Sequence, residues 1–203
     1  MIYFIATSSV FNNSPIRQFQ YTTAISKLKL LLSSFPADYR LIIVENNGNR
    51  HTFLNELHDT VFYTYNNFLN VSNKGIKELQ DIFDCIQHFN IQDDDFIVKL
   101  TARYILHDDT PFLEAVKNLH QSMDCIIRYG SCFGTSTHKI DDCITGLIGM
   151  RCFYLKLIQF PLEHECAEWK WAQTANTIHH EKIHSLDRLG IDICPGTDDY
   201  FTV

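Results

Sequence analysis

The stretch Asp93-Asp94-Asp95-Phe96-Ile97-Val98-Lys99-Leu100-Thr101-Ala102-Arg103-Tyr104 indicates how the chain folds. Three aspartates form a polar turn, and the short apolar run after them is typical of a strand buried in a parallel sheet. The run opens into Lys99, Thr101 and Arg103. Ligands of open α/β sheets bind at the carboxyl ends of the strands, and these three side chains together favour an anion. The stretch therefore predicts a strand that ends in an anion-binding site.

Further apolar or β-branched runs predict other strands, and apolar residues at helical spacing predict the helices between them. Strands are expected at residues 2–6, 39–44, 60–65, 123–129 and 189–193, with a further core segment at 143–150. Helices are expected at residues 17–33 and 76–86, after residue 111 and from residue 161, and residues 130–141 are expected to form a loop. This alternation, without a repeat, predicts one α/β domain over residues 1–203, a three-layer sandwich with a mostly parallel central sheet.

Composition limits the classes of partner. The 203 residues carry a formal net charge of -7, and because tracking a nucleic-acid backbone requires a basic face, no nucleic acid is expected as a partner. The seven cysteines form no Cys-x-x-Cys pair, which favours buried, reduced thiols and a cytoplasmic location. No apolar run approaches the ~18 residues of a membrane span, and the start of the chain lacks the basic residues of a signal segment.

Polar side chains follow other predicted strands as well. Thr7-Ser8 comes after the first strand and Glu45-Asn46 after the second, where a carboxylate can accept hydrogen bonds from a ribose hydroxyl or a base. Asn73-Lys74-Gly75 opens a helix, whose free N–H groups and dipole favour an anion. Turn chemistry explains the first two pairs equally well, and a lysine at a helix start is most often solvated surface.

Five short motifs occur in order along most of the chain. They are Arg17-x-x-Gln20-Tyr21, Ile42-Ile43-Val44-Glu45-Asn46, Asn73-Lys74-Gly75, Lys99-x-Thr101-x-Arg103-Tyr104 and Thr145-Gly146-Leu147-Ile148-Gly149-Met150. Each is weak alone, but the ordered set resembles small glycosyltransferases of the GT-A fold, the compact kind found in viruses and in bacterial surface-glycan loci. The resemblance implies a cytoplasmic enzyme, in the host cytoplasm if the protein is viral.

The resemblance implies transfer of a sugar from a nucleoside-diphosphate sugar to a glycan or a protein-linked glycan. Thr7, Glu45 and Asn46 would lie near the base and ribose, and Lys74 near the diphosphate. Cationic side chains or a divalent metal stabilise a departing diphosphate, and Lys99 and Arg103 would supply such charge. The implied donor-binding residues are Thr7, Ser8, Arg17, Glu45, Asn46, Asn73, Lys74, Gly75, Lys99 and Thr101, and Arg103 is an implied catalytic residue.

The chain departs from the family in two ways. Most members carry Asp-x-Asp after the fourth strand to hold Mg²⁺ or Mn²⁺, whereas this chain has residues 99–103 there. Asp108 is the candidate metal ligand, although helix capping is an alternative role for it. The cofactor would be Mn²⁺ or Mg²⁺, with no organic cofactor. Ala102 also stands where such proteins often have glycine, which limits how closely the backbone approaches a ligand.

Two glutamates are candidates for the general base that deprotonates an acceptor hydroxyl. Glu165 and Glu168 are three residues apart and would share a helix face. Glu168 is preferred because the neighbouring Trp169 offers an aromatic platform for a sugar ring. The alternative is an ordinary solvated helix face, since glutamates are mostly exposed.

A competing motif lies near the end of the chain. His180-Glu181-Lys182-Ile183-His184 matches His-Glu-x-x-His, which places two histidines on one helix face to bind zinc. A third ligand would have to come from Asp187, Asp192, Asp198 or Asp199. A zinc-dependent hydrolase is therefore one alternative function, and a non-catalytic nucleotide-binding or glycan-binding domain is another.

Overall fold

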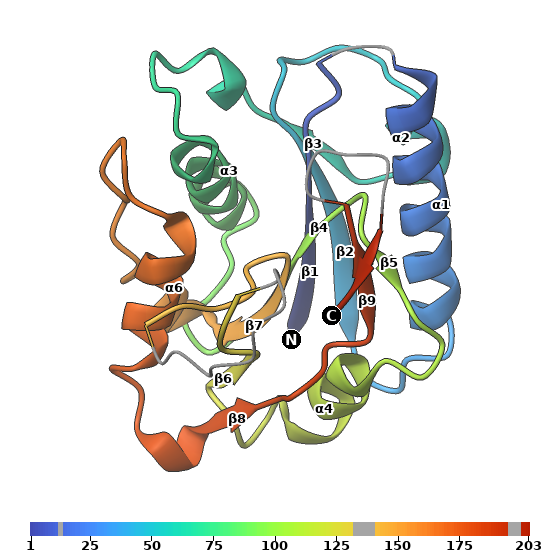
Figure 1. The fold of residues 1–203 in the computed structure, drawn as a ribbon. Coiled ribbons are helices and arrows are strands. Elements are labelled where there is room, and N and C mark those ends of the chain that lie inside the picture. Colours follow the sequence, from blue (N-terminus) through green and yellow to red (C-terminus); the bar gives the residue numbers. More distant parts are fainter. Residues whose placement is uncertain (12–13, 132–140, 195–199) are drawn as a thin grey trace.

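A seven-stranded sheet lies between two layers of helices in the computed structural model, which describes residues 1–11, 14–131, 141–194 and 200–203 (Figure 1). The strand order is β3-β2-β1-β4-β7-β6-β8. The first four run parallel, and β7 is antiparallel to both of its neighbours. The bounds are β1 (Ile2–Ser8), β2 (Tyr39–Glu45), β3 (Val61–Tyr63), β4 (Phe96–Thr101), β6 (Cys125–Ile127), β7 (Leu147–Arg151) and β8 (Ile183–Ser185). The predicted mostly parallel sheet is confirmed.

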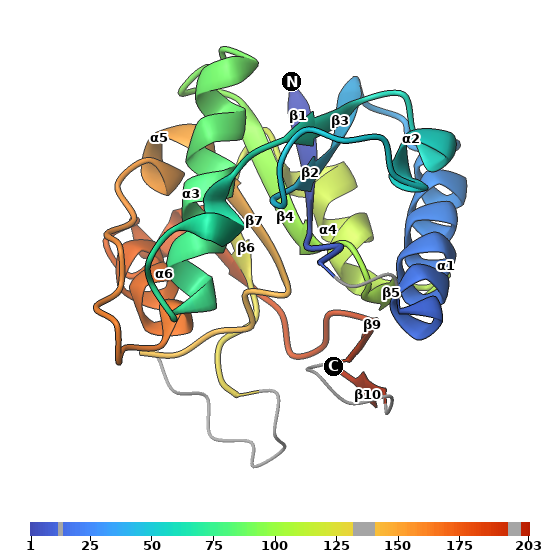
Figure 2. The same ribbon diagram turned by 90° about the horizontal axis from the view of Figure 1, so that it is seen from above.

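The helices cover both faces of this sheet (Figure 2). One layer holds α1 (Pro15–Leu32), α2 (Leu54–Leu57) and α4 (Pro111–Leu119), and the other holds α3 (Lys74–His88), α5 (Cys152–Leu155) and α6 (Ala167–Ala175). Two 3-10 helices, η1 (Asn66–Phe68) and η2 (His180–Lys182), lie in connections. None of the helices in the described ranges has both the length and the apolar character needed to cross a bilayer.

Side chains alternate along the central strands between two hydrophobic cores. Phe4 and Val98 pack on the α1 side, whereas Ile5 and Ile97 pack on the α3 side. Because side chains of a strand alternate with period two, Lys99 shares the α3 face with Ile97. The thiols of Cys85, Cys125, Cys143 and Cys152 are buried and free, as predicted.

A second sheet brings the end of the chain to the α1 side of the molecule. It consists of β5 (Ile105–Leu106), β9 (Ile191–Ile193) and β10 (Phe201–Thr202), all antiparallel, and β5 lies against α1 (Figure 1). Since β5 follows β4 after only three residues, this small sheet places Cys194 beside the end of β4.

The last helix differs from its prediction. It was expected from residue 161, but α6 begins at Ala167, because Leu162 and Glu165 first close a turn. In that turn the Glu165 N–H donates to the Leu162 carbonyl, and the Glu165 carboxylate accepts from the Leu162 N–H. The loop predicted at residues 130–141 falls largely outside the described residues, which omit 132–140.

Candidate active site

Three parallel strands end side by side at the carboxyl edge of the large sheet. Ser8 of β1 is paired with Glu45 of β2, and Thr7 of β1 with Thr101 of β4. Two groups of polar side chains lie at this edge. We call them the Glu45 cluster (Ser8, Val10, Glu45, Asn47 and Arg50) and the Lys99 cluster (Thr7, Glu78, Lys99, Thr101 and Thr145).

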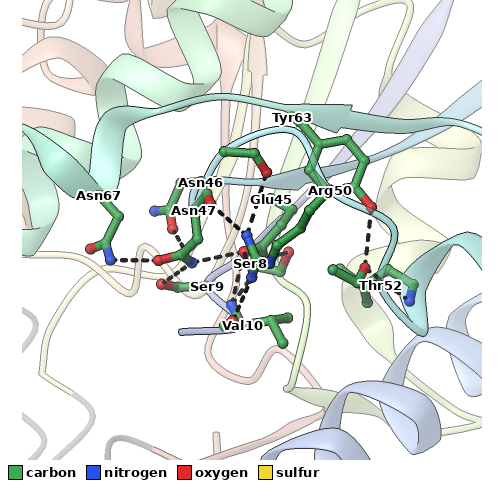
Figure 3. Close-up of polar contacts among 12 residues, drawn as sticks. Ser8, Ser9, Val10, Glu45, Asn46, Asn47, Arg50, Thr52, Tyr63 and Asn67 are labelled. Atoms are coloured by element: carbon green, nitrogen blue, oxygen red, sulfur yellow. Dashed lines mark hydrogen bonds and ion pairs between the residues drawn. The ribbon is translucent and has the colours of Figure 1, made fainter. Parts of the chain in front are cut away.

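The Glu45 carboxylate is fully buried and accepts hydrogen bonds from three sides (Figure 3). The Ser8 hydroxyl donates to Oε2 at 2.9 Å, and the Val10 N–H donates to the same oxygen at 2.9 Å. The Asn47 side-chain amide donates to Oε1 at 2.7 Å. Glu45 therefore holds the loop after β1 in place through internal hydrogen bonds.

Arg50 closes the Glu45 cluster from the outside. Its Nη2 lies 3.3 Å from Glu45 Oε1, and its guanidinium also donates to the carbonyls of Asn47 at 2.5 Å and Val10 at 2.6 Å. The Arg50 side chain is 37% exposed, whereas that of Glu45 is 0% exposed. The charge that this cluster presents outward is thus positive.

Asp81 of α3 ties the loops after β2 and β3 to the helix layer. It is buried, and it accepts hydrogen bonds from Asn46 at 3.0 Å, Asn66 at 2.8 Å and Thr64 at 2.5 Å. Burial raises the pKa of Asp81 to about 6, although these hydrogen bonds act in the opposite direction. The predicted donor-binding residue Asn46 therefore has an internal partner.

Lys99 lies buried at the centre of the Lys99 cluster. Its Nζ donates to the Thr145 carbonyl at 2.6 Å and to the Thr101 hydroxyl at 3.3 Å. It also lies 2.9 Å from Oε1 of Glu78, which comes from α3. The Thr7 hydroxyl donates to the same Glu78 oxygen at 2.5 Å. The cluster thus joins β1, β4, the segment before β7, and α3.

Glu78 is the more exposed member of this ion pair. Its side chain is 31% exposed, against 2% for Lys99. Burial raises the pKa of Glu78, but the charge of Lys99 and the hydrogen bonds from Thr7 and Lys99 outweigh burial, so the pKa lies below its ordinary value. Glu78 is therefore a carboxylate at neutral pH.

A second carboxylate lies beside this cluster. The Thr145 hydroxyl donates to Oε1 of Glu168 at 3.3 Å, and Glu168 is half-buried in the first turn of α6. The neighbouring Trp169 is exposed. Thr145 therefore contacts Lys99 through its carbonyl and Glu168 through its hydroxyl.

Two arginines lie on the α1 side of the same strand ends. Arg103 Nε donates to the Cys194 carbonyl at 3.0 Å, and its guanidinium lies over the Tyr104 ring. Arg17 Nη1 donates to Oε1 of Gln20 at 3.0 Å, and the Gln20 amide contacts Cys194 Sγ. Arg103 directly, and Arg17 through Gln20, therefore both approach Cys194.

Solved structures share this arrangement of strands and helices. A glycosyltransferase involved in glycosylation of the major capsid of PBCV-1 superposes with a TM-score of 0.53 over 92% of this chain and 81% of that one, at 7% identity. A 4-diphosphocytidyl-2C-methyl-D-erythritol synthase gives 0.55 over 97% and 94%, at 10% identity. The chain has a GT-A-like fold.

A third structure with the GT-A-like fold was determined with ligands. The mannosyltransferase PcManGT from Pyrobaculum calidifontis, in complex with GDP-Man and Mn²⁺, gives a TM-score of 0.55 at 14% identity over 91% of this chain and 53% of that one. No protein-family model and no curated protein matches the sequence.

The predicted residues at the start of α3 make internal contacts in this GT-A-like fold. Asn73 caps the helix by accepting from the Gly75 N–H at 2.9 Å, and its amide donates to the carbonyls of residues 162, 163 and 165. A Cβ on Gly75 would collide with the Cβ of Ala167. Asn73 and Gly75 thus bring α3 against the start of α6, while Lys74 is exposed.

Glu165 does not lie on α6. It precedes that helix, accepts from the Leu162 N–H at 2.7 Å and pairs with Lys170 at 3.1 Å. The prediction that Glu165 and Glu168 share a helix face is therefore wrong, because the turn that Glu165 forms delays the start of the helix.

The carboxylates at the strand edge do not fit a divalent metal. Asp108, the predicted ligand, is exposed and pairs with Lys27 of α1. Oxygen donors suit Mg²⁺ and Mn²⁺, but the Lys99 ammonium already neutralises Glu78. Within the described ranges, no three His, Cys, Asp or Glu side chains come together as a metal site.

The zinc motif is not on an α-helix. His180 lies in η2 and His184 in β8, so the two side chains do not share a helical face. The interpretation of residues 180–184 as a zinc-binding helix is wrong, because the segment lacks the apolar helical face that would support one. Asp198 and Asp199, two of the candidate third ligands, lie outside the described residues.

Sequence reasoning missed Glu78, the partner of Lys99. A signal was present, because Glu78 and Asp81 lie one helical turn before the buried residues Ile82 and Cys85. Acidic side chains on the buried face of an amphipathic helix need internal partners. The sequence alone does not show which strand supplies them.

Proposed function

We propose that the protein is a glycosyltransferase that moves a sugar from a nucleoside-diphosphate sugar to a glycan or protein-linked glycan. The observation that carries the proposal is the convergence at one sheet edge of two carboxylates, Glu78 and Glu168, with two guanidinium groups on the other side, Arg17 and Arg103. This combination suits a ligand with a hydroxyl-rich part and an anionic part.

The GT-A-like neighbours support the choice of donor. One is a glycosyltransferase involved in glycosylation of the major capsid of PBCV-1, and another was solved in complex with GDP-Man and Mn²⁺. The synthase that shares the fold shows that the fold alone does not fix the reaction, so the proposal depends on the residues at the edge.

In this proposal the arginines hold the diphosphate. Arg17 and Arg103 are half-buried, and planar guanidinium groups bind phosphate oxygens bidentately. Their positive charges stabilise the negative charge that develops as the diphosphate leaves. The Glu45 cluster shapes the loop after β1, where Thr7 and Ser8 end the strand, and so positions the nucleoside.

Glu168 is the proposed general base. The Thr145 hydroxyl holds its carboxylate at the edge, and the exposed Trp169 lies next to it. The carboxylate accepts the proton of the acceptor hydroxyl while that oxygen bonds to the anomeric carbon and the bond to the diphosphate breaks. Among the described residues, the side chains at this edge do not by themselves form a divalent-metal site, so metal dependence is tested with Mn²⁺.

A binding screen tests the donor class. Wild-type protein is titrated calorimetrically with UDP-GlcNAc and GDP-Man, with and without Mn²⁺, beside the variants Arg103→Gln and Arg188→Gln. Arg188 is the matched control, because it forms an exposed ion pair with Asp109. We expect Arg103→Gln to weaken binding about 10–100-fold, the effect of losing a hydrogen bond to a charged group, and Arg188→Gln to bind as wild type.

Two outcomes would contradict the proposal. Failure of the wild type to bind either nucleotide sugar, with or without Mn²⁺, would argue against the donor class. Binding without release of nucleoside diphosphate in the presence of glycan acceptors would favour the non-catalytic binding domain.

A further inference from the structure

The Lys99 ammonium has no donor left for a ligand. An ammonium carries three N–H bonds, and the structure gives it three acceptors: the Thr145 carbonyl, the Thr101 hydroxyl and Glu78. Lys99 is also almost completely buried. A phosphate could reach it only by displacing these partners, so Lys99 is not the group that meets the ligand at the end of β4.

Glu78 is the member of the pair that reaches the surface. Within the described chain, Thr7 and Lys99 both contact its Oε1, which leaves Oε2 for an outside donor. An ionised carboxylate only accepts hydrogen bonds and repels phosphate, whereas it binds hydroxyl groups well. The end of β4 thus presents a hydroxyl-binding group where the sequence predicts a phosphate-binding one.

The neighbouring charges favour the same assignment. Burial raises the pKa of Glu78, and the Lys99 charge, the hydrogen bonds and finally the charge of Arg103 lower it. Arg103 follows Thr101 of the Lys99 cluster by two residues, so the guanidinium and the carboxylate belong to the same strand end. A hydroxyl-binding carboxylate beside a phosphate-binding guanidinium matches the junction between a sugar ring and a diphosphate.

We infer that Glu78 binds hydroxyl groups of the transferred sugar, and that Lys99 is its internal counter-ion and a positioning residue, not a phosphate ligand. This inference rests on the proposed function. It assigns the α3 side of the strand edge to the sugar and the α1 side to the diphosphate.

The test compares ligands with and without the sugar. Calorimetric titrations with UDP, UDP-GlcNAc, GDP and GDP-Man are run on wild type, Glu78→Gln, Lys99→Met and the control Glu114→Gln, an exposed α4 residue. We expect Glu78→Gln to weaken binding of a bound nucleotide sugar at least about tenfold, and binding of its nucleoside diphosphate less than about twofold. Glu114→Gln should match wild type with every probe.

Lys99→Met separates positioning from direct phosphate binding. If Lys99 only positions Glu78, Lys99→Met should weaken binding of the nucleotide sugar but not of the nucleoside diphosphate, as Glu78→Gln does. The double variant should then bind the nucleotide sugar no more weakly than Glu78→Gln. Equal weakening of sugar-bearing and sugar-free nucleotides would show that Lys99 contacts phosphate. If Lys99→Met fails to fold, the titrations of Glu78→Gln alone test whether Glu78 binds the sugar.

Two different failures can be told apart. A wild type that binds none of the four probes would overturn the proposed function and this inference with it. A wild type that binds a nucleotide sugar, with Glu78→Gln binding it equally well, would overturn the inference alone.

Discussion

The Glu45 cluster and the Lys99 cluster have the same arrangement with opposite charges. Each buries an ionised side chain at the end of a central strand and neutralises it with a more exposed partner. Glu45 is covered by Arg50, whereas Lys99 is covered by Glu78. The charge facing outward is therefore opposite in sign to the charge on the strand, so a strand-end residue type does not by itself predict the ligand.

The two clusters also differ in what they join. The Glu45 cluster connects the loops after β1 and β2, and its Arg50 lies only five residues along the chain. The Lys99 cluster joins β4 to α3 and to the segment before β7, 21 and 46 residues away in sequence. The Glu45 cluster therefore stabilises two neighbouring loops, whereas the Lys99 cluster holds α3 against the sheet at the proposed sugar site.

Removing Glu45 should have the largest effect on stability. Glu45→Ala leaves Arg50 without its ion-pair partner and the Val10 N–H without its acceptor, whereas the Ser8 hydroxyl still has the Val44 carbonyl. We expect the free energy of unfolding to fall by about 2–4 kcal/mol, because a buried donor left without an acceptor costs about 1–3 kcal/mol and Arg50 also loses its counter-ion. Urea denaturation followed by circular dichroism measures it.

Glu45→Gln is the matched variant for this prediction. It keeps one acceptor oxygen and the side-chain volume, so it should lower the free energy of unfolding clearly less than Glu45→Ala does. An exposed ion pair contributes at most about 1 kcal/mol to stability. If Glu45→Ala lowered the free energy of unfolding by less than that, the Glu45 cluster would not be holding the loops after β1 and β2 together.

Asp81 links the two clusters, and its contribution to the free energy of unfolding depends on pH. It binds Asn46, next to Glu45, and lies on the same helix as Glu78. Its pKa is raised from 3.8 to about 6, mainly by burial, so the folded state binds the proton more tightly than the unfolded state. Stability from this group is complete below pH 3.8 and is lost as pH rises through 6.

The variant Asp81→Asn cannot titrate at this position and supplies the reference. We expect the unfolding free energy of wild type minus that of Asp81→Asn to fall by up to about 3 kcal/mol between pH 4 and pH 7. Urea titrations at several pH values measure this difference. A difference that stays constant or rises with pH would show that Asp81 is ionised in the folded protein throughout this range.

The sequence predicts the central strands because their signals are local, but it misses the short strands β5, β8 and β10. The run from Phe96 to Leu100 predicts β4, and Lys99 within it, between Val98 and Leu100, belongs to the strand and not to a loop. The partner of Lys99 depends on how α3 packs on the sheet, and no local pattern in residues 93–104 contains that information. Glu78 was missed for this reason.

Two errors came from patterns that have more than one structural outcome. An acidic segment after a proline is typical of a helix start, yet Glu165 uses its carboxylate to close a turn, and α6 begins at Ala167. His180 and His184 have zinc-ligand spacing only if residues 180–184 are helical, whereas His184 lies in β8. Spacing predicts a site only when the secondary structure it assumes is present.

Lys99→Met should be less destabilising than Glu45→Ala, because it leaves no buried backbone N–H without an acceptor and the stranded Glu78 can reach water. We expect a loss of about 1–3 kcal/mol at neutral pH, below the usual cost of breaking a fully buried pair. The pKa of Glu78 is lowered in the folded protein from 4.5, so the pair contributes stability above pH 4.5 that is lost as pH falls through the folded pKa. The difference in unfolding free energy between wild type and Lys99→Met should therefore become smaller as the pH falls. For Asp81 the corresponding difference becomes larger as the pH falls. Urea titrations from pH 3 to pH 7 measure the difference for Lys99→Met, and a difference independent of pH would mean that Lys99 stabilises the fold through Thr101 and Thr145 and not through Glu78.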